Sequence, residues 1–366
     1  MIFKRNSCRW VVAVCRDRPS HEFGSMIFSV ISRVTCGVLG IALFVATSTS
    51  AFAQDDDAFH YNRLLGRGIN LGNALDGPRE GAWGVTLEDF RLIKEAGFNS
   101  VRIPIRWSAH ASTSAPYDIE TDFFQRVDWA IEQALSRNLA IVINVHHYEE
   151  MNQDPAQNLP RLVELWRQIA LRYQNQPKGL MFELLNEPHD RLDDERWQEA
   201  FPQVLKAIRD SNPDRMVVIG PSPLNGIERL DKLHLRPQDR RIIGTFHYYN
   251  PFQFTHQGAP WVKDSEPWRG TRWTGTPQER EQLRLEFERA AVWARQNNRP
   301  LYLGEFGVYW EANMDDRALW TRAVAREAEK WGFSWSYWEF SSEFGAYDPA
   351  AQQWRRPLLD ALLDKN

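Results

Sequence analysis

Two glutamates are the first residues of this sequence whose type and placement suggest chemistry. Glu187 and Glu305 each stand near the end of an apolar run of strand length, 180–187 and 301–307. Hydrolysis of a glycosidic bond needs such a pair of carboxyl groups: one protonates the leaving oxygen, and the other attacks the sugar or activates water. A single glutamate at a strand end is more often a solvated or salt-bridged carboxylate, so the pair needs support from its neighbours.

Further candidate residues lie within or near the ends of the neighbouring apolar runs. They are Arg102, His146, His147, Asn186, His247, Tyr249 and Trp338. Asn186 can donate a hydrogen bond to a sugar 2-hydroxyl, a contact that strengthens in the transition state of glycoside hydrolysis. Arg102 can keep a nearby Glu305 ionised, because an adjacent cation favours the charged form of a carboxyl group. Polar groups at the ends of several runs indicate one shared site.

Alternation of side chains along a strand sorts these residues further. Glu183 shares a face with Glu187 but lies about two layers deeper in a strand with this alternation. We interpret Glu183 as a buried structural carboxylate paired with an inward-pointing base. His247 and Tyr249 likewise share one face, and Tyr248 points to the other. We therefore expect His247 and Tyr249 in the site, with Tyr249 donating to the attacking carboxylate.

The adjacent pair His146-His147 allows a second interpretation. Histidines with Asp or Glu as further ligands can hold a metal ion such as Zn²⁺. Neighbouring residues on a strand point to opposite sides, so the two imidazoles cannot easily bind one ion. We therefore expect both histidines to bind sugar hydroxyls, and we expect neither a metal ion nor a cofactor.

The elements that would position these residues alternate between strand-length apolar runs and helix-length amphipathic runs. The predicted strands are 68–73, 100–105, 140–147, 180–187, 216–221, 242–249, 301–307 and 334–340. The predicted helices are 86–96, 121–137, 159–173, 194–210, 276–296 and 317–331, and the segment after the fifth strand is short and weakly helical. Apolar strands separated by helices indicate a parallel sheet covered on both faces.

Eight such strands in one domain predict an α/β protein that consists of a single (β/α)₈ TIM barrel. An open, doubly wound sheet would be expected to carry a Gly-x-Gly-x-x-Gly turn after its first strand, and this motif is absent from the sequence. In a parallel barrel the carboxyl ends of all strands meet at one face, where enzymes of this fold carry out their chemistry. Residues far apart in the sequence would therefore converge on one cleft.

Composition limits the classes of partner. The chain has 16 Trp, 20 Phe and 10 Tyr, which indicates either a large aromatic core or flat rings that line a groove for sugars. Positions 1–53 hold six Lys or Arg and two Asp or Glu, so the remainder has 38 basic against 46 acidic residues and a formal net charge of −8. A net acidic chain without basic runs is a poor candidate for binding nucleic acid or an anionic membrane.

Residues 1–53 have the pattern of a targeting segment. An apolar run, 36–47, follows Arg33 and precedes Ala51-Phe52-Ala53, as in a secretory signal that is cleaved after Ala53. The run is too short for a comfortable membrane span, so a retained anchor is the lesser alternative. Five basic residues precede Met26, which favours Met26 as the true start of translation.

The remaining chain divides into a short stub, 54–64, and the barrel domain, 65–366. All three cysteines lie before residue 54. The mature chain would therefore contain no disulfide and no thiol nucleophile.

Six short motifs surround the polar residues at the strand ends. In chain order they are Val101-Arg102-Ile103-Pro104, Asn144-Val145-His146-His147, Leu185-Asn186-Glu187-Pro188, His247-Tyr248-Tyr249, Gly304-Glu305-Phe306-Gly307 and Tyr337-Trp338-Glu339. They resemble, in type and in order, the motifs of glycoside hydrolase family 5, which includes endo-β-1,4-glucanases and β-mannanases. The resemblance covers nearly everything from residue 65 to residue 363.

This resemblance implies that Glu187 is the catalytic acid/base and Glu305 the nucleophile. It places further active-site positions at Arg102, His146, Asn186, His247, Tyr249 and Trp338. Many members of the family have Asp two residues before the first histidine of the pair, whereas this chain has Asn144. This difference affects the properties of the His146 side chain and leaves the catalytic mechanism unchanged.

The first predicted strand resembles that of a subgroup of thermophile endoglucanases that also cleave mannans. Its sequence is Gly68-Ile69-Asn70-Leu71-Gly72-Asn73-Ala74-Leu75. This likeness implies substrate-binding roles for Asn73, Asp76, His147, His256 and Trp261. The segment 250–275, with Trp261, Trp268 and Trp273, would form a wall of the cleft, although packing within the loop would also explain the last two.

The resemblance implies a retaining endo-β-1,4-glycanase that acts on β-1,4-glucan and on glucomannan or mannan. The signal-like segment predicts that it is secreted, periplasmic or extracellular, and we expect a monomer. Once the signal is cleaved, we expect no stable association with a membrane. A carbohydrate-binding protein on an inactive barrel is one alternative, but it would need a broken catalytic pair, and both glutamates are present. A metal-dependent barrel hydrolase that uses His146 and His147 is the other, and insensitivity to a strong chelator would exclude it.

Overall fold

The computed structural model describes residues 57–77 and 84–364. The predicted targeting segment, 1–53, with its cleavage after Ala53 and its alternative start at Met26, lies outside these residues and stays a prediction. In the two described ranges, no helix combines the length and the apolar character that a membrane span requires.

Within the described residues, eight parallel strands form a closed barrel in chain order. They are β1 (Arg67–Asn70), β2 (Ser100–Ile103), β3 (Ala140–Asn144), β4 (Leu180–Glu183), β5 (Val217–Ile219), β6 (Ile242–His247), β7 (Leu301–Glu305) and β8 (Ser334–Tyr337). Gly68 of β1 lies opposite both Ser100 of β2 and Ser336 of β8, which closes the ring. The predicted (β/α)₈ barrel is confirmed.

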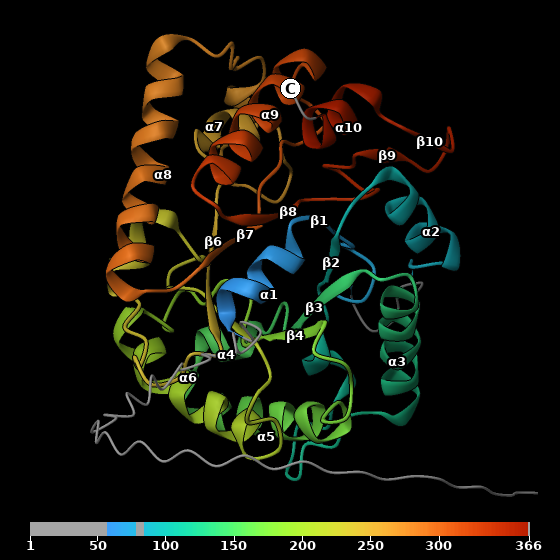
Figure 1. Ribbon diagram of the computed structural model, residues 1–366, viewed down its shortest axis with the longest axis vertical. Coiled ribbons are helices and arrows are strands. Elements are labelled where there is room, and N and C mark those ends of the chain that lie inside the picture. The colour runs from blue at the N-terminus through green and yellow to red at the C-terminus, as the bar shows by residue number, and fades with distance from the viewer. Residues whose placement is uncertain (1–56, 78–83, 365–366) are drawn as a thin grey trace, which may run out of the picture. The chain divides into compact units, whose positions relative to one another are not determined.

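Helices connect and surround the strands (Figure 1). The segments after the eight strands contain, in order, α2 (Leu87–Ala96), α3 (Thr121–Ser136), α5 (Pro155–Arg172), α6 (Asp194–Arg209), the 3₁₀ helix η2 (Ile227–Lys232), α8 (Pro277–Asn297), α9 (Met314–Lys330) and α10 (Arg356–Leu363). Shorter elements within these connections are η1 (Trp107–His110), α4 (Glu149–Gln153), α7 (Phe252–Thr255), η3 (Glu266–Trp268) and a hairpin of β9 (Tyr347–Asp348) and β10 (Gln353–Trp354). All six predicted helices are present, and the weakly helical segment after the fifth strand is η2.

Local sequence explains where several helices begin. Thr86 caps α2: its hydroxyl accepts from the backbone N–H of Asp89, whose carboxylate accepts from the backbone N–H of Thr86. This reciprocal arrangement satisfies N–H groups that a helix start otherwise leaves unpaired. α5 begins at Pro155, earlier than predicted, because Asp154 caps it and proline is well suited to the first helical turn.

All eight strands end earlier than the sequence suggested, and two of these early ends change the geometry of the site. β3 stops at Asn144 rather than at residue 147, and β4 stops at Glu183 rather than at residue 187. His147 and Glu187 then take left-handed backbone conformations, with φ of 48° and 45°. Strand alternation therefore does not continue to the ends of the predicted runs, and the turns decide where those side chains point.

The barrel interior is apolar at the amino-terminal end of its strands. There α1 (Ala58–Leu65) packs Ala58, Tyr61 and Leu65 onto inward-facing strand residues, and Figure 1 shows α1 lying over the barrel. These strand residues are Val142, Met181, Met216, Val218, Ile243 and Tyr302. The segment expected only as a stub thus supplies part of an apolar plug, and polar groups gather at the opposite end.

Many tryptophans belong to the core between the strands and the surrounding helices. The largest fully buried side chains include Trp107, Trp166, Trp197, Trp273, Trp320 and Trp335. The aromatic-core explanation of the high tryptophan content is correct for these residues. Trp261 and Trp310 are instead exposed.

Candidate active site

A groove of about 900 Å³ lies at the carboxyl ends of the barrel strands. Eleven predicted site residues line it: Asn73, His146, His147, Asn186, Glu187, His247, Tyr249, His256, Trp261, Glu305 and Trp338. The other two, Asp76 and Arg102, are buried next to residues of the groove. The fold therefore brings together residues that lie as far apart in the sequence as Asn73 and Trp338.

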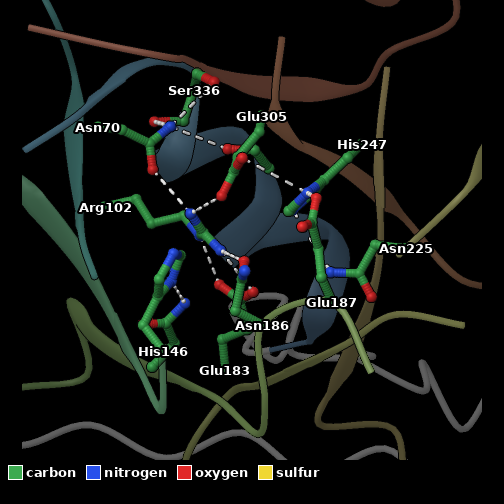
Figure 2. Close-up of polar contacts among 12 residues, drawn as sticks. Asn70, Arg102, His146, Glu183, Asn186, Glu187, Asn225, His247, Glu305 and Ser336 are labelled. Atoms are coloured by element: carbon green, nitrogen blue, oxygen red, sulfur yellow. Dashed lines mark hydrogen bonds and ion pairs between the residues drawn. The ribbon is translucent and has the colours of Figure 1, made fainter. Parts of the chain in front are cut away.

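Arg102 on β2 is fully buried and donates five hydrogen bonds beneath the groove (Figure 2). Its Nε and Nη2 bind the two carboxylate oxygens of Glu183 at 2.6 and 2.8 Å. Nη1 donates to Glu305 Oε1 at 2.7 Å and to Asn70 Oδ1 at 2.8 Å, and Nη2 also donates to Asn186 Oδ1 at 2.7 Å. A planar guanidinium with five N–H groups suits this arrangement. Glu183 is thus the buried, paired carboxylate that alternation predicted.

Glu305 ends β7 and is bound from two sides. The Tyr249 hydroxyl donates to its Oε2 at 2.9 Å, as predicted, and Arg102 donates to its Oε1. The residue before Glu305 is Gly304, where a side chain would crowd His247: a Cβ there would lie only 3.0 Å from His247 Nε2. Burial raises the pKa of Glu305, and the charges of His247 and Arg102 offset this only in part. Arg102 therefore lowers the pKa of Glu305, as predicted, but burial raises this pKa by more.

Glu187 faces Glu305, with His247 between them (Figure 2). His247 Nδ1 lies 2.6 Å from Glu187 Oε1 and 3.6 Å from Glu305 Oε2. One carboxylate oxygen of each glutamate and an imidazole nitrogen all lie within 4.8 Å of one another. Burial acts to raise the pKa of Glu187, but the hydrogen bond and the charge of His247 outweigh it, so this pKa is lowered. Burial acts to lower the pKa of His247, but the two carboxylates raise it.

His146 is buried, and its surroundings select one neutral tautomer. Burial holds the pKa of His146 well below its usual range. Asn144 Oδ1 accepts from the backbone N–H of Ile105 at 3.2 Å, which orients the amide so that Nδ2 donates to His146 Nδ1 at 3.1 Å. The ring hydrogen therefore resides on Nε2. The ring stacks parallel to Trp338, with centroids 6.0 Å apart, and Nε2 remains a hydrogen-bond donor.

The prediction that His146 and His147 point to opposite sides is wrong. The left-handed backbone at His147 brings the two rings together, with centroids 4.5 Å apart. One ligand atom each of Asp76, His146 and His147 lies within 4.8 Å of the others. However, Asn144 occupies His146 Nδ1 and a hydrogen occupies Nε2, so this ring offers a metal ion no free lone pair.

Asp76 lies behind His147 rather than on the groove surface. It is 2% exposed, and its Oδ2 lies 3.8 Å from His147 Nε2. Burial raises the pKa of Asp76 to about 6. The resemblance implied that Asp76 binds substrate. Because Asp76 is buried and His147 lines the groove, Asp76 would act on a bound sugar through its contact with His147.

The segment 250–275 supplies only part of the predicted cleft wall. His256 and Trp261 line the groove. Trp268 packs edge-on against Phe252, and Trp273 is buried in the core. The prediction of a cleft wall is therefore wrong for Trp268 and Trp273, which stabilise the loop and its base.

Two residues near the catalytic pair were not predicted from the sequence. Asn225 follows β5 in a left-handed turn, with φ of 51°, and its side-chain amide lies 3.4 Å from His247 Nε2. His189 lines the groove, and its Nδ1 lies 2.6 Å from the backbone oxygen of Glu187. The pair Asn225-Gly226 is a turn signal, which was the one local indication that this loop returns to the site.

A parallel barrel with two facing glutamates in the groove at the carboxyl ends of its strands has the architecture of a glycoside hydrolase. Residues 68–344 match the family model of the cellulases, glycosyl hydrolase family 5. The chain belongs to this family, as its motifs indicated.

Curated relatives of the chain are named endoglucanases. Endoglucanase H of Acetivibrio thermocellus is 36% identical over 307 residues, which cover 83% of this chain and 33% of that protein. Endoglucanase C of the same organism is 27% identical over 315 residues, which cover 76% of this chain and 90% of that protein. The chain thus spans about a third of the length of endoglucanase H.

Solved structures agree with the family. Endoglucanase Cel5A of the hyperthermophile Thermotoga maritima superposes with a TM-score of 0.82 at 50% identity, over 84% of this chain and 100% of that chain. Cel5A has also been solved in complex with cellobiose and with mannotriose.

Proposed function

We propose that the chain is a secreted, retaining endo-β-1,4-glycanase that hydrolyses β-1,4-glucan and also accepts glucomannan or mannan. Family membership and the endoglucanase relatives support hydrolysis of β-1,4-linked glucose. One observation carries the retaining mechanism: an oxygen of Glu187 and an oxygen of Glu305 lie within 4.8 Å of each other. Retaining enzymes hold the two carboxyl groups about 5–5.5 Å apart, whereas inverting enzymes need about 6.5–9.5 Å to admit a water molecule.

In this proposal Glu305 is the nucleophile and Glu187 the acid/base. Arg102 and Tyr249 bind the two oxygens of Glu305 and favour its ionised form. Glu305 attacks the anomeric carbon and forms a glycosyl ester, while Glu187 gives its proton to the leaving oxygen. Glu187 then takes a proton from water, whose oxygen displaces Glu305, and the sugar leaves with its original configuration.

His247 can supply the proton that Glu187 needs. In the free site, the raised pKa of His247 and the lowered pKa of Glu187 favour the proton on the imidazole. Transfer across the hydrogen bond of 2.6 Å gives neutral imidazole and the acid form of Glu187. The same transfer removes two opposite influences on the pKa of Glu305: the charge of His247, which lowers it, and the charge of Glu187, which raises it. The three groups therefore titrate as a unit.

Acceptance of both glucans and mannans follows from the groups around the sugar 2-hydroxyl, whose orientation differs between glucose and mannose. The polar groups available in the groove are Asn73, His146, His147 and Asn186. Trp338 adds a stacking face that does not distinguish the epimers. The cellobiose and mannotriose complexes of Cel5A support the same breadth here. We expect comparable kcat/KM values on β-glucan and mannan, because only a strictly hydrogen-bonded site reaches discrimination of about 10⁴–10⁵.

The decisive experiment for the mechanism is NMR of the first-formed product. The β-anomer should appear first and then mutarotate, and initial release of the α-anomer would contradict the retaining scheme. Azide separates the two roles. Glu305→Ala with azide should give the inverted glycosyl azide, whereas Glu187→Ala with azide should give the retained one. The opposite pattern would show that the roles are reversed.

Two further parts of the proposal have simple tests. Activity that persists in a strong chelator would exclude the alternative of a metal-dependent hydrolase that uses His146 and His147. Secretion rests on the signal-like pattern of residues 33–53. A mature amino terminus at Gln54 in the exported protein would support it, and a retained amino-terminal segment would contradict it.

A further inference from the structure

Trp310, in the loop between β7 and α9, has a side chain that is 54% exposed. It lines a second hollow of about 580 Å³, which we call the distal hollow. The polar residues around it are Arg317, Ser341, Ser342, Glu343, Asp348 and Arg355. An exposed flat ring beside several hydrogen-bonding groups suits a sugar ring, because a pyranose has an apolar face and a polar rim.

The distal hollow adjoins the catalytic groove. Glu343 lines both of them. Asn73, which lines the groove, donates to Ser342 Oγ of the distal hollow at 2.6 Å. The backbone N–H of Trp310 donates to the carbonyl oxygen of Glu343 at 3.0 Å, which ties the loop after β7 to the loop after β8. The two spaces are therefore adjacent, with the polar side chains of Asn73, Ser342 and Glu343 at their boundary.

A cluster of aromatic rings supports both spaces. The ring of Trp261 in the groove lies 5.0 Å from the ring of Tyr309, which lies 5.7 Å from the ring of Trp310. Phe344 packs against Tyr309 and Trp261, with centroids 5.8 and 6.2 Å away. Trp261 and Trp310 are equally exposed, so the cluster presents two large aromatic surfaces to solvent.

Arg317 is a buried cation in the lining of the distal hollow and is only 2% exposed. Its Nη2 donates to the carbonyl oxygen of Phe344 at 3.2 Å, whereas its Nε has no hydrogen-bond partner in the described part of the chain. Because this Nε has no surface accessible from the hollow, the hydrogen bonds to a sugar would come from the more exposed Ser341, Ser342 and Glu343.

We propose that the distal hollow binds a further sugar unit of the β-1,4-linked chain in the groove, with Trp310 as its stacking platform. This inference rests on the proposed function and extends it to long substrates. The contact is remote from the bond that is cleaved, so it stabilises the bound substrate and the transition state equally. It therefore lowers KM for long chains and leaves kcat unchanged.

The test compares cellohexaose, a long substrate, with a chromogenic cellobioside that is too short to occupy both spaces. Trp310→Ala should raise KM for cellohexaose about three- to tenfold, the size of one aromatic stacking contact. Its kcat on cellohexaose and its kcat/KM on the cellobioside should not change, and the latter shows that the variant is folded. Trp310→Phe keeps a flat ring and should recover part of the loss.

Leu171→Ala is the matched control, because it removes another exposed apolar side chain, 56% exposed, from α5. It should alter neither substrate. An unchanged KM for cellohexaose in Trp310→Ala, or an equal loss on both substrates, would overturn the distal sugar site while leaving the proposed function intact. Failure of the wild-type protein to hydrolyse either substrate would overturn the proposed function and this inference together.

Discussion

Replacement of Arg102 by lysine should destabilise the protein strongly although the positive charge is kept. Arg102 is 0% exposed and donates five hydrogen bonds. Lysine has three N–H donors on a single nitrogen, so at least two of the five bonds are lost. A buried hydrogen bond to a charged group contributes about 1.5–3 kcal/mol. The loss of two such bonds costs about 3–6 kcal/mol, and we expect a loss of this size.

Equilibrium unfolding in urea, followed by tryptophan fluorescence, measures this change in the free energy of unfolding. Arg67→Lys is the control. Arg67 also donates Nε and Nη2 to one carboxylate, Glu329, but these side chains are 22% and 28% exposed. The control should lose less than about 1 kcal/mol. A similarly small loss for Arg102→Lys would refute the reasoning that burial and the planar fork of donors make this contact strong.

Three further substitutions test single contacts of the site. Asn144→Asp replaces a donor to His146 Nδ1 by an acceptor, so the ring hydrogen should move to Nδ1 and the pKa of His146 should rise. Imidazole ¹⁵N shifts unchanged from the wild type would contradict this. Tyr249→Phe removes the O–H donor to Glu305 Oε2 and should lower kcat about ten- to a hundredfold, as expected for a hydrogen bond to a charged group. An unchanged kcat would exclude the role. Asp76→Asn removes a carboxylate whose pKa is raised from 3.8 to about 6. Because the folded pKa lies above the unfolded one, ionisation of Asp76 opposes folding, and this cost develops as the pH rises from about 4 to about 6 and stays constant above that. The variant should be more stable by about 3 kcal/mol at pH 7, and the gain should vanish near pH 4. An equal gain at both pH values in urea unfolding would disprove this explanation.

The barrel and most residues of the groove could be predicted because they follow from local patterns. Apolar runs that alternate with amphipathic helices specify a parallel barrel, and the barrel brings the carboxyl end of each strand to one face. Glu305 ends such a run, and Glu187 closely follows one. The bond from Tyr249 to Glu305 was predicted by alternation, which holds two residues beyond the end of β6 because no left-handed residue intervenes.

Alternation failed where the backbone turned left-handed beyond the end of a strand. At His147 and Glu187 the backbone turns left-handed, although neither residue is a glycine. Such a conformation is uncommon for these residue types and is held by surrounding structure rather than by local preference. The joint placement of His146 and His147 was therefore not accessible from the sequence.

The sequence by itself determined the fold class, the family motifs and the identity of the two glutamates, because each depends on residues close together in the chain. Only the tertiary structure decided how charge and protons are distributed among them. Burial raises the pKa of Glu305 despite Arg102, and the two carboxylates raise that of His247 despite burial. The distal hollow beside Trp310 likewise exists only where two loops from different strands meet. Burial and contacts between distant segments arise when the barrel closes, so no local pattern contains them.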